Sequence, residues 1–373
     1  MGREPHGVSH SRPQAAERPA DQLPETMRAL RKVRKAPGAE LVDVPVPQPA
    51  PGEVLIKVEA ASICGTDLHI YDWDPWAAGR ITDLPMTFGH EVAGRVQAIG
   101  SEAHHLQLGT FVSAEGHVFC GFCPPCRSGK AHICENLRIL GVDFDGGFAE
   151  YVVLPERNAW EVDKRIPPEV ASIHDPFGNA VHTAFSGDGA SELVAATVVV
   201  LGCGPIGLFA VGISRASGAR QVIAVEPNEF RLGLAKQMGA DLLVDPGKED
   251  PVEAVLAATD GHGAEVVLEM SGVPMVIDQG TRMLARAGRM SLLGLPSEPV
   301  ALDLTDQVIF KEARLVGVTG RELFRTWQQM TTLLATGMVD VVPVITHRFR
   351  LEQFEDAFQV MASGRSGKVI LTP

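Results

Sequence analysis

The sequence predicts an α/β protein in which a compact β domain is joined to a doubly wound parallel sheet. Three observations support this: strand-like segments between residues 27 and 178, alternating strand and helix patterns between 179 and 320, and further strand-like segments between 321 and 373. The chain has 373 residues, of which 45% are hydrophobic and 21% charged, so it is long enough for two domains with their own cores.

The charge balance and the amino-terminal segment exclude several classes of protein. The formal net charge is −13, from 33 basic and 46 acidic side chains, and no basic stripe is present, so no nucleic-acid partner is expected. No membrane partner is expected, because no apolar run is long enough to span a bilayer. Residues 1–26 lack a hydrophobic core segment, so we predict a disordered tail rather than a secretory signal. We expect a cytoplasmic location, where thiols stay reduced.

The segment 27–178 has the pattern of a β domain. Its strand-like stretches are separated by turns rich in proline and glycine and lie at residues 41–47, 53–63, 91–100 and 147–154. In the second stretch Val54, Ile56 and Val58 recur at every second position, as expected of a strand.

The segment 179–320 alternates short apolar strands with helical stretches. It opens with TVVVLGCGPIGLFAVGISRASGA at 197–219, and further strands are expected at 221–226, 242–244, 264–270, 289–295 and 314–319. This alternation is typical of a doubly wound parallel sheet. The segment 321–373 is expected to contain one helix and then strands that return to the first domain.

A glycine motif identifies the second domain as a dinucleotide-binding domain. Gly202, Gly204 and Gly207 form G-x-G-x-x-G between a predicted strand and a predicted helix, a context that makes this otherwise weak motif strong. Glu226 ends the next strand, where a carboxylate is expected to hold ribose hydroxyls and to favour NAD over NADP. The predicted cofactor-binding residues are Gly202, Gly204, Pro205, Ile206, Gly207, Glu226, Arg231, Leu293 and Gly294.

Four cysteines crowd into one predicted lobe at about residues 115–140. Their spacing is C-x2-C-x2-C-x7-C, at Cys120, Cys123, Cys126 and Cys134. Four thiolates satisfy tetrahedral zinc with no open position, which is typical of a structural site. An iron–sulfur cluster is the alternative, since four thiolates also suit it. A disulfide cluster fits a small secreted domain rather than a chain of this kind.

A second group of residues predicts a catalytic metal site. Cys64 and His90, with a carboxylate from Glu91 or Asp175, would make a mixed zinc site with room for water or substrate. Such a zinc polarises a substrate hydroxyl, from which hydride passes to nicotinamide. Thr66 and His69 follow Cys64 closely and are predicted to relay the released proton to solvent.

Together these motifs resemble the zinc-containing medium-chain alcohol dehydrogenase family over residues 27–373, because GHE, the cysteine lobe and G-x-G-x-x-G occur in that family's order. The resemblance implies a GroES-like catalytic domain at 27–178, a Rossmann NAD-binding domain at 179–320, a return to the catalytic domain at 321–373, and a homotetramer with NAD and two zinc ions per subunit. Residue by residue, it assigns Cys64, His90 and Glu91 to the catalytic zinc, Asp175 to a conditional ligand position, Thr66 and His69 to the relay and His117 to the substrate side.

The substrate is predicted from stretches that lie mostly outside the metal and cofactor motifs. Five stretches, ICGTDLHIYDWDPWA, EGHVFCGFC, DPFGNAVHTA, VTGRELFRTW and ITHRF, resemble those of family members that oxidise L-threonine at C3 to 2-amino-3-oxobutyrate. This resemblance implies coupling to a 2-amino-3-oxobutyrate CoA ligase. A polyol or vicinal-diol dehydrogenase, of the sorbitol or 2,3-butanediol type, is the alternative within enzymes. A non-catalytic NAD-binding protein would be expected to lack a zinc ligand or a relay residue, and all of these are present.

Overall fold

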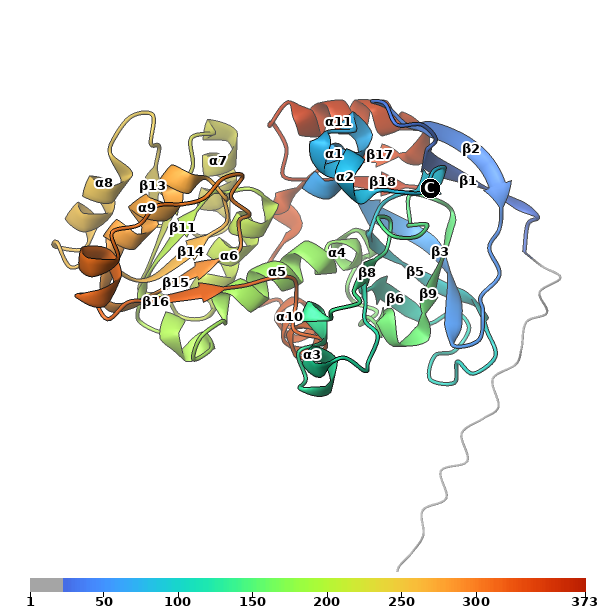
Figure 1. Ribbon diagram of the computed structural model, residues 1–373, viewed down its shortest axis with the longest axis horizontal. Coiled ribbons are helices and arrows are strands. Elements are labelled where there is room, and N and C mark those ends of the chain that lie inside the picture. The colour runs from blue at the N-terminus through green and yellow to red at the C-terminus, as the bar shows by residue number, and fades with distance from the viewer. Residues whose placement is uncertain (1–22) are drawn as a thin grey trace, which may run out of the picture.

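The computed structural model describes residues 23–373, which form two bodies side by side (Figure 1). The body on the right in Figure 1 contains the blue and green strands together with the red carboxyl-terminal strands. The body on the left contains the yellow and orange strands of a separate sheet. The predicted architecture of a β domain combined with a parallel-sheet domain is confirmed.

The right-hand body is built on a seven-stranded sheet that is antiparallel apart from one parallel pair, β17 with β18. The last strand of the chain lies beside β3, with Ile370 opposite Ser62, so the carboxyl terminus completes a sheet begun by the first half of the chain. The strands of this sheet are β3 (Glu53–Ser62), β5 (Glu91–Ile99), β6 (Phe111–Ala114), β9 (Tyr151–Pro155), β10 (Ala159–Glu161), β17 (Ile345–Arg350) and β18 (Lys368–Thr372).

The fold begins earlier than predicted. Strand β1 (Thr26–Lys32) pairs with β2 (Glu40–Pro45) and β4 (Met86–Thr87), and Leu23 packs against the apolar cluster beside β1. The prediction that residues 23–26 belong to the tail is therefore wrong, because Leu23 buries apolar surface and Thr26 lies in the β1–β2 ladder. The rest of the predicted tail, residues 1–22, lies outside the described residues.

The left-hand body contains a six-stranded sheet in which every neighbouring pair is parallel, in the order β13-β12-β11-β14-β15-β16. Because the chain continues to opposite sides of β11, the carboxyl ends of β11 and β14 border the crevice in which such sheets bind ligands. The strands are β11 (Thr197–Leu201), β12 (Gln221–Val225), β13 (Leu242–Val244), β14 (Ala264–Glu269), β15 (Leu284–Leu292) and β16 (Arg314–Gly317).

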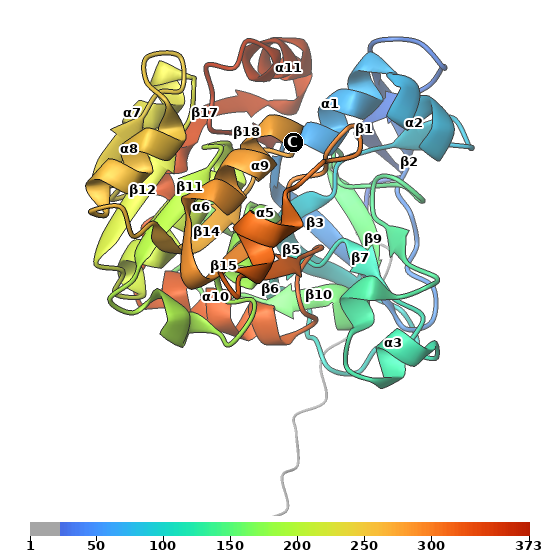
Figure 2. The ribbon, with the colours of Figure 1, turned by 60° about the vertical axis from the view of Figure 1, so that its left-hand side comes forward.

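Helices connect these strands and join the two bodies (Figure 2). Three of them share one apolar core: Phe177 of α5 meets Phe209 of α6 edge to face with 5.5 Å between ring centroids, and Trp327 of α10 is fully buried in the same cluster. The longer helices are α1 (Gly65–Asp72), α5 (His174–Ala184), α6 (Pro205–Ala216), α7 (Glu229–Gln237), α8 (Pro251–Ala258), α9 (Pro274–Met283), α10 (Arg325–Ala335) and α11 (Phe354–Ala362); the shorter are α2 (Pro75–Arg80), α3 (Pro124–Arg127) and α4 (Pro168–Ser172).

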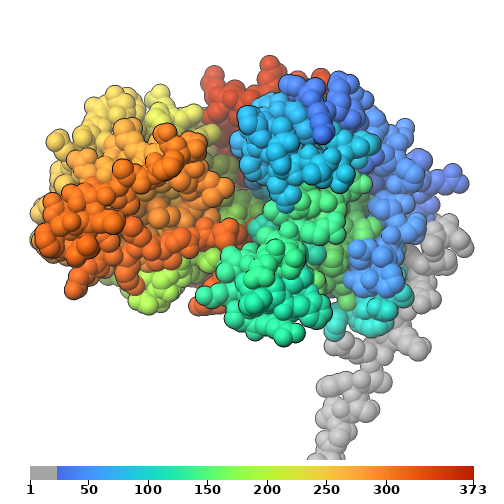
Figure 3. All heavy atoms as spheres, viewed as in Figure 1, coloured from blue at the N-terminus to red at the C-terminus, as the bar shows by residue number. Residues whose placement is uncertain are grey.

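The space-filling view shows a hollow between the orange surface of one body and the blue-to-green surface of the other (Figure 3). Between residues 23 and 373, no helix is long and apolar enough to cross a membrane.

Candidate metal centres and active site

Cys64 stands at the amino-terminal end of helix α1, separated from the end of strand β3 by Ile63. It is the N-cap residue, and its backbone N–H donates to Oδ2 of Asp67 at 2.9 Å. The other carboxylate oxygen of Asp67, Oδ1, lies 3.5 Å from Nδ1 of His90. Asp67 is completely buried, so its carboxylate bonds the backbone of Cys64 and lies beside the imidazole of His90 in the protein interior.

Glu91 begins strand β5 and is buried beside His90. Its Oε2 atom accepts hydrogen bonds from the hydroxyl of Ser62 and from Nζ of Lys368, whose ammonium also donates to the carbonyl oxygen of Ile63 at 2.7 Å. Its Oε1 atom is buried and has no hydrogen-bond partner. A buried carboxylate oxygen without a partner is costly, so it fits an atom that binds a cation.

Cys64, His90 and Glu91 form a group with metal-binding geometry. Each offers one ligand atom, and the three atoms lie within 4.8 Å of one another. A thiolate, an imidazole and a carboxylate suit zinc, and three protein ligands leave a fourth position for water or substrate. The sequence separates Cys64 from the other two residues, and the pairing of β3 with β5 brings them together.

Asp175 lies near this group without belonging to it. A Cβ atom added to Gly116 would lie 3.4 Å from the carbonyl oxygen of His90 and 3.8 Å from Oδ2 of Asp175, so both residues border the same glycine. The Oδ2 atom of Asp175 lies 2.8 Å from Nη2 of Arg321. Its carboxylate is therefore paired with a cation in this structure.

Arg321 also binds a second buried carboxylate, that of Glu115. Its Nε donates to Oε2 of Glu115 at 2.9 Å, its Nη2 donates to Oε1, and its Nη1 donates to Oδ1 of Asn179 at 3.1 Å. Trp327 Nε1 donates to Oε2 of Glu115 at 2.6 Å. Glu115 is fully buried, and the Arg321 guanidinium holds the pKa of this carboxyl below its usual value although burial alone would raise it.

His117 is in contact with the Glu115–Arg321 network. Its backbone N–H donates to Oε1 of Glu115 at 2.8 Å, and its ring atom Cε1 lies 3.0 Å from where a Cβ of Gly320 would be. Burial, reinforced by the charge of Arg321, lowers the pKa of His117, so its imidazole is neutral near neutral pH.

The two predicted relay residues differ in their exposure to solvent. The hydroxyl of Thr66 is half-buried, 3.9 Å from Sγ of Cys64. His69 follows three residues later on the same face of α1; it is exposed, and its Nδ1 lies 2.6 Å from Oδ2 of Asp74.

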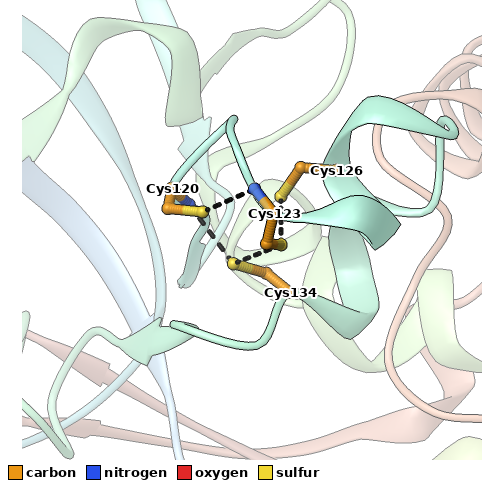
Figure 4. A group of neighbouring side chains, drawn as sticks. All are labelled: Cys120, Cys123, Cys126 and Cys134. Carbon is orange, nitrogen blue, oxygen red and sulfur yellow. Dashed lines mark hydrogen bonds between the residues drawn. The ribbon is translucent and has the colours of Figure 1, made fainter.

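The four lobe cysteines converge on one point (Figure 4). The sulfur of Cys123 lies 3.4 Å from that of Cys126 and 3.7 Å from that of Cys134, and no cysteine between residues 23 and 373 forms a disulfide. Zinc–sulfur bonds of about 2.3 Å in a tetrahedron require sulfur atoms about 3.8 Å apart. Backbone N–H groups of Phe122 and Cys123 lower the pKa of Cys120 to about 6, which favours the thiolate.

The glycine turn leaves space for a phosphate group at the start of α6. Gly202 has a φ of 86°, and a Cβ on Gly207 would lie 1.9 Å from the carbonyl oxygen of Gly202, so neither position accepts a side chain without rearrangement. Gly204 caps α6 and Pro205 is its first residue, and the unpaired backbone N–H groups of a first turn bind anions.

Glu226 lies against this turn, directly after strand β12. It is 5% exposed; its Oε2 accepts a hydrogen bond from the backbone N–H of Cys203 at 2.7 Å and its Oε1 accepts one from Asn228 at 3.1 Å. Arg231 lies in the first turn of α7, and its Nε is buried without a partner.

Leu293 and Gly294 follow strand β15 at the same edge of the sheet. Their backbone N–H groups donate to the carbonyl oxygen of Glu269, at 3.0 and 3.3 Å. A Cβ on Gly294 would lie 2.1 Å from the backbone nitrogen of Gly272, so two loops pass close together here. The predicted cofactor residues thus gather at the carboxyl ends of β11, β12 and β15, as a bound dinucleotide requires.

Comparison with known proteins identifies the family. Residues 50–164 match the alcohol dehydrogenase GroES-like domain, and residues 205–336 match the zinc-binding dehydrogenase family. The chain is 52% identical over 352 residues to the L-threonine 3-dehydrogenase of Symbiobacterium thermophilum, covering 94% of this chain and 99% of that protein. This chain belongs to the L-threonine 3-dehydrogenase family of zinc-binding dehydrogenases. Its identity to the L-threonine 3-dehydrogenase of Bacillus subtilis is 51% over 347 residues, covering 93% of this chain and 99% of that protein.

Solved structures of zinc-binding dehydrogenases and related alcohol dehydrogenases share the fold. An alcohol dehydrogenase of Escherichia coli in complex with NADH superposes with a TM-score of 0.85 at 28% identity, covering 94% of this chain and 100% of that chain. The 2R,3R-butanediol dehydrogenase of Bacillus subtilis superposes with a TM-score of 0.83 at 26% identity, covering 93% of this chain and 99% of that chain.

Several residues around the family's metal position are not evident from the sequence. Asp67 could have been found, since an acid three residues after a helix N-cap is a local signal. Glu115, Arg321 and Lys368 carry no such signal, because their partners are 206 and 277 residues away along the chain.

Proposed function

We propose that this chain oxidises L-threonine at C3 to 2-amino-3-oxobutyrate with transfer of hydride to NAD+. The identity of 52% to an L-threonine 3-dehydrogenase over nearly the whole of both chains supports the substrate. The observation that carries the chemistry is the Cys64–His90–Glu91 group, in which a buried oxygen of Glu91 has no partner.

The proposal assigns two zinc ions to each chain. Cys64, His90 and Glu91 would hold the catalytic ion, which when bound polarises the secondary hydroxyl so that hydride can pass to the nicotinamide of NAD. Cys120, Cys123, Cys126 and Cys134 would hold the structural ion. Zinc is favoured over an iron–sulfur cluster because the chain belongs to a zinc-binding family.

The chain's own residues would supply the proton path and a neutral hydrogen-bonding group beside the substrate. Thr66 would accept the hydroxyl proton in the buried part of the site, and His69 would pass it to solvent at the surface of α1. The lowered pKa of His117 keeps its imidazole neutral, so on the substrate side, where the resemblance puts it, it would donate or accept a hydrogen bond to substrate without adding a charge.

NAD is favoured over NADP by the carboxylate of Glu226. This side chain lies beside the glycine turn, where it would accept bonds from ribose hydroxyls and repel a 2′-phosphate. Gly202, Gly204, Pro205, Ile206 and Gly207 would receive the pyrophosphate, with Arg231, Leu293 and Gly294 at the border of the site.

The assembly and the fate of the product belong to the same proposal and rest on the family resemblance. We propose that the chain forms a homotetramer in the cytoplasm and that a CoA ligase consumes its product, 2-amino-3-oxobutyrate.

The test is NADH formation with L-threonine beside 2,3-butanediol, sorbitol and L-serine in one zinc-replete buffer. A kcat/KM for L-threonine at least tenfold above that of each competitor supports the proposal. A higher value for 2,3-butanediol or for sorbitol would mean that this chain is a vicinal-diol or polyol dehydrogenase, as the alternative prediction has it. Repeating the assay with NADP+ tests the role of Glu226, since kcat/KM with NADP+ is expected to be lower.

A further inference from the structure

Glu115 and Arg321 form a buried ion pair beside the Cys64–His90–Glu91 group, and the proposed chemistry leaves this pair without a function. Arg321 is 1% exposed and Glu115 is fully buried. The two residues lie 206 positions apart: Glu115 directly follows strand β6, and Arg321 precedes helix α10. A charge pair this deeply buried is weak evidence for stability, because removing two charges from water offsets most of their attraction.

The Glu115–Arg321 contacts fix the orientation of both side chains in addition to neutralising their charges. The guanidinium binds Glu115 through both Nε and Nη2, a bidentate contact that fixes the plane of the group. Trp327 donates to the same carboxylate at 2.6 Å and the backbone of His117 donates at 2.8 Å, so Glu115 itself cannot rotate. Asn179 accepts from the remaining nitrogen at 3.1 Å.

The one partner of Arg321 that lies near the metal position is Asp175. Its Oδ2 lies 2.8 Å from Nη2 of Arg321, and the same oxygen would lie 3.8 Å from a Cβ on Gly116, which also borders His90. Asp175 is 6% exposed, so its carboxylate must be compensated inside the protein. Two compensating cations are available to it: the guanidinium, or a metal ion held by Cys64, His90 and Glu91.

We propose that Glu115 is a positioning residue that, through Arg321, holds the Asp175 carboxylate away from the metal. The fourth position of the ion then stays open for the substrate hydroxyl, as a catalytic zinc site requires. Without the Glu115–Arg321 pair, Asp175 becomes an uncompensated buried carboxylate beside a divalent cation and moves to bind it. This inference rests on the proposed metal site, and its test separates the two.

The test uses Co2+ in place of zinc, because the visible absorption of cobalt reports its ligands whereas zinc is spectroscopically silent. The main variant is Glu115→Gln/Arg321→Met, which removes both charges of the pair together and so avoids leaving one of them unpaired. Its Co2+ spectrum is expected to differ from that of the parent protein without substrate. Adding Asp175→Asn to this variant is expected to restore the parent spectrum, because the invading carboxylate is gone.

The matched control is Arg289→Met. Arg289 is also fully buried and pairs with a glutamate, Glu192, at 2.8 Å, but it lies in the parallel-sheet body and contacts none of the site residues. Its loss is expected to lower stability and to leave the Co2+ spectrum unchanged. The single variant Glu115→Gln, which keeps Arg321, is expected to show a smaller change of the same kind and serves if the double variant does not fold.

In kinetics, the double variant is expected to lose at least tenfold in kcat, with a smaller change in the KM for NAD+. A parent-like Co2+ spectrum in the double variant, or a changed spectrum that persists when Asp175 is replaced, would overturn the positioning role. If the parent protein itself binds no Co2+ beyond that held by the cysteine lobe, the metal-site proposal fails first, and the positioning role falls with it.

Discussion

Replacing Lys368 by methionine tests whether Glu91 lies within reach of a metal ion. The Lys368 ammonium is 2% exposed and is a hydrogen-bond donor to the buried Glu91 carboxylate. Breaking a buried ion pair by removing one partner costs about 3–5 kcal/mol, because the remaining charge has no compensation. For a domain of about 150–250 residues each kcal/mol shifts Tm by about 2–4 °C, so the metal-free variant is expected to melt about 6–20 °C below the metal-free parent.

Zinc is expected to reduce this loss. When the ion binds Glu91 through the free Oε1, the carboxylate is compensated again, and what remains is the lost bond to the carbonyl oxygen of Ile63. An unsatisfied buried acceptor costs about 1–3 kcal/mol, which corresponds to about 2–12 °C. The assay is thermal unfolding of parent and variant, each with chelator and with zinc; the contribution of the cysteine lobe cancels because both proteins share it.

Lys32→Met provides the control for this experiment. Lys32 is also fully buried, but its ammonium donates only to backbone carbonyls, among them those of Gly38 and Tyr71 at 2.8 Å each. Its loss is expected to lower Tm by the same amount with and without zinc. An equal Tm loss for Lys368→Met in the two metal states would refute the reasoning, since Glu91 would then gain nothing from the ion.

Three further predictions concern the metal and cofactor sites. Cys64→Ser is expected to lower the zinc content from about two ions to about one per chain and to abolish turnover, while NADH affinity by fluorescence titration stays within about twofold; loss of both would mean that Cys64 supports the fold. Gly207→Ala places a Cβ 1.9 Å from the carbonyl oxygen of Gly202, so NADH affinity is expected to fall at least tenfold with zinc content unchanged, and normal NADH binding would contradict the turn's role. Burial alone lowers the pKa of His90, but Asp67 and Cys64 outweigh it and hold that pKa well above its ordinary value. Because the imidazole must lose its proton to bind a metal, zinc affinity measured by chelator competition is expected to fall as the pH drops below this raised pKa. A zinc affinity that does not change with pH would argue against His90 as a ligand.

Local sequence patterns were sufficient for much of the fold and for the four-cysteine metal group. The glycine turn and the cysteine lobe are each contained in a short segment, so their spacing determines their geometry. The parallel sheet follows from the alternation of apolar strands and helices. Cys64 and His90 are farther apart in the sequence; their residue types indicated a metal site, and the family resemblance then assigned them, with Glu91, to one ion.

The residues that position the site were not predictable from such patterns. Glu115 with Arg321 and Glu91 with Lys368 are pairs made by the return of the carboxyl-terminal segment, and a buried charge looks like a surface charge in the sequence. The amino-terminal boundary was misplaced for a related reason: the strand that starts at Thr26 depends on its pairing with β2 and not on its own composition.

The central claim is that turnover of L-threonine needs an ion at Cys64, His90 and Glu91 in addition to the one in the cysteine lobe. The most direct measurement is a zinc titration of the chelator-treated protein, with bound metal and NADH formation from L-threonine followed in the same samples. The account predicts saturation near two zinc ions per chain, with an activity plateau in the parent and no activity at saturation in Cys64→Ser, which saturates near one. Full activity with one zinc ion per chain, or in Cys64→Ser, would contradict it.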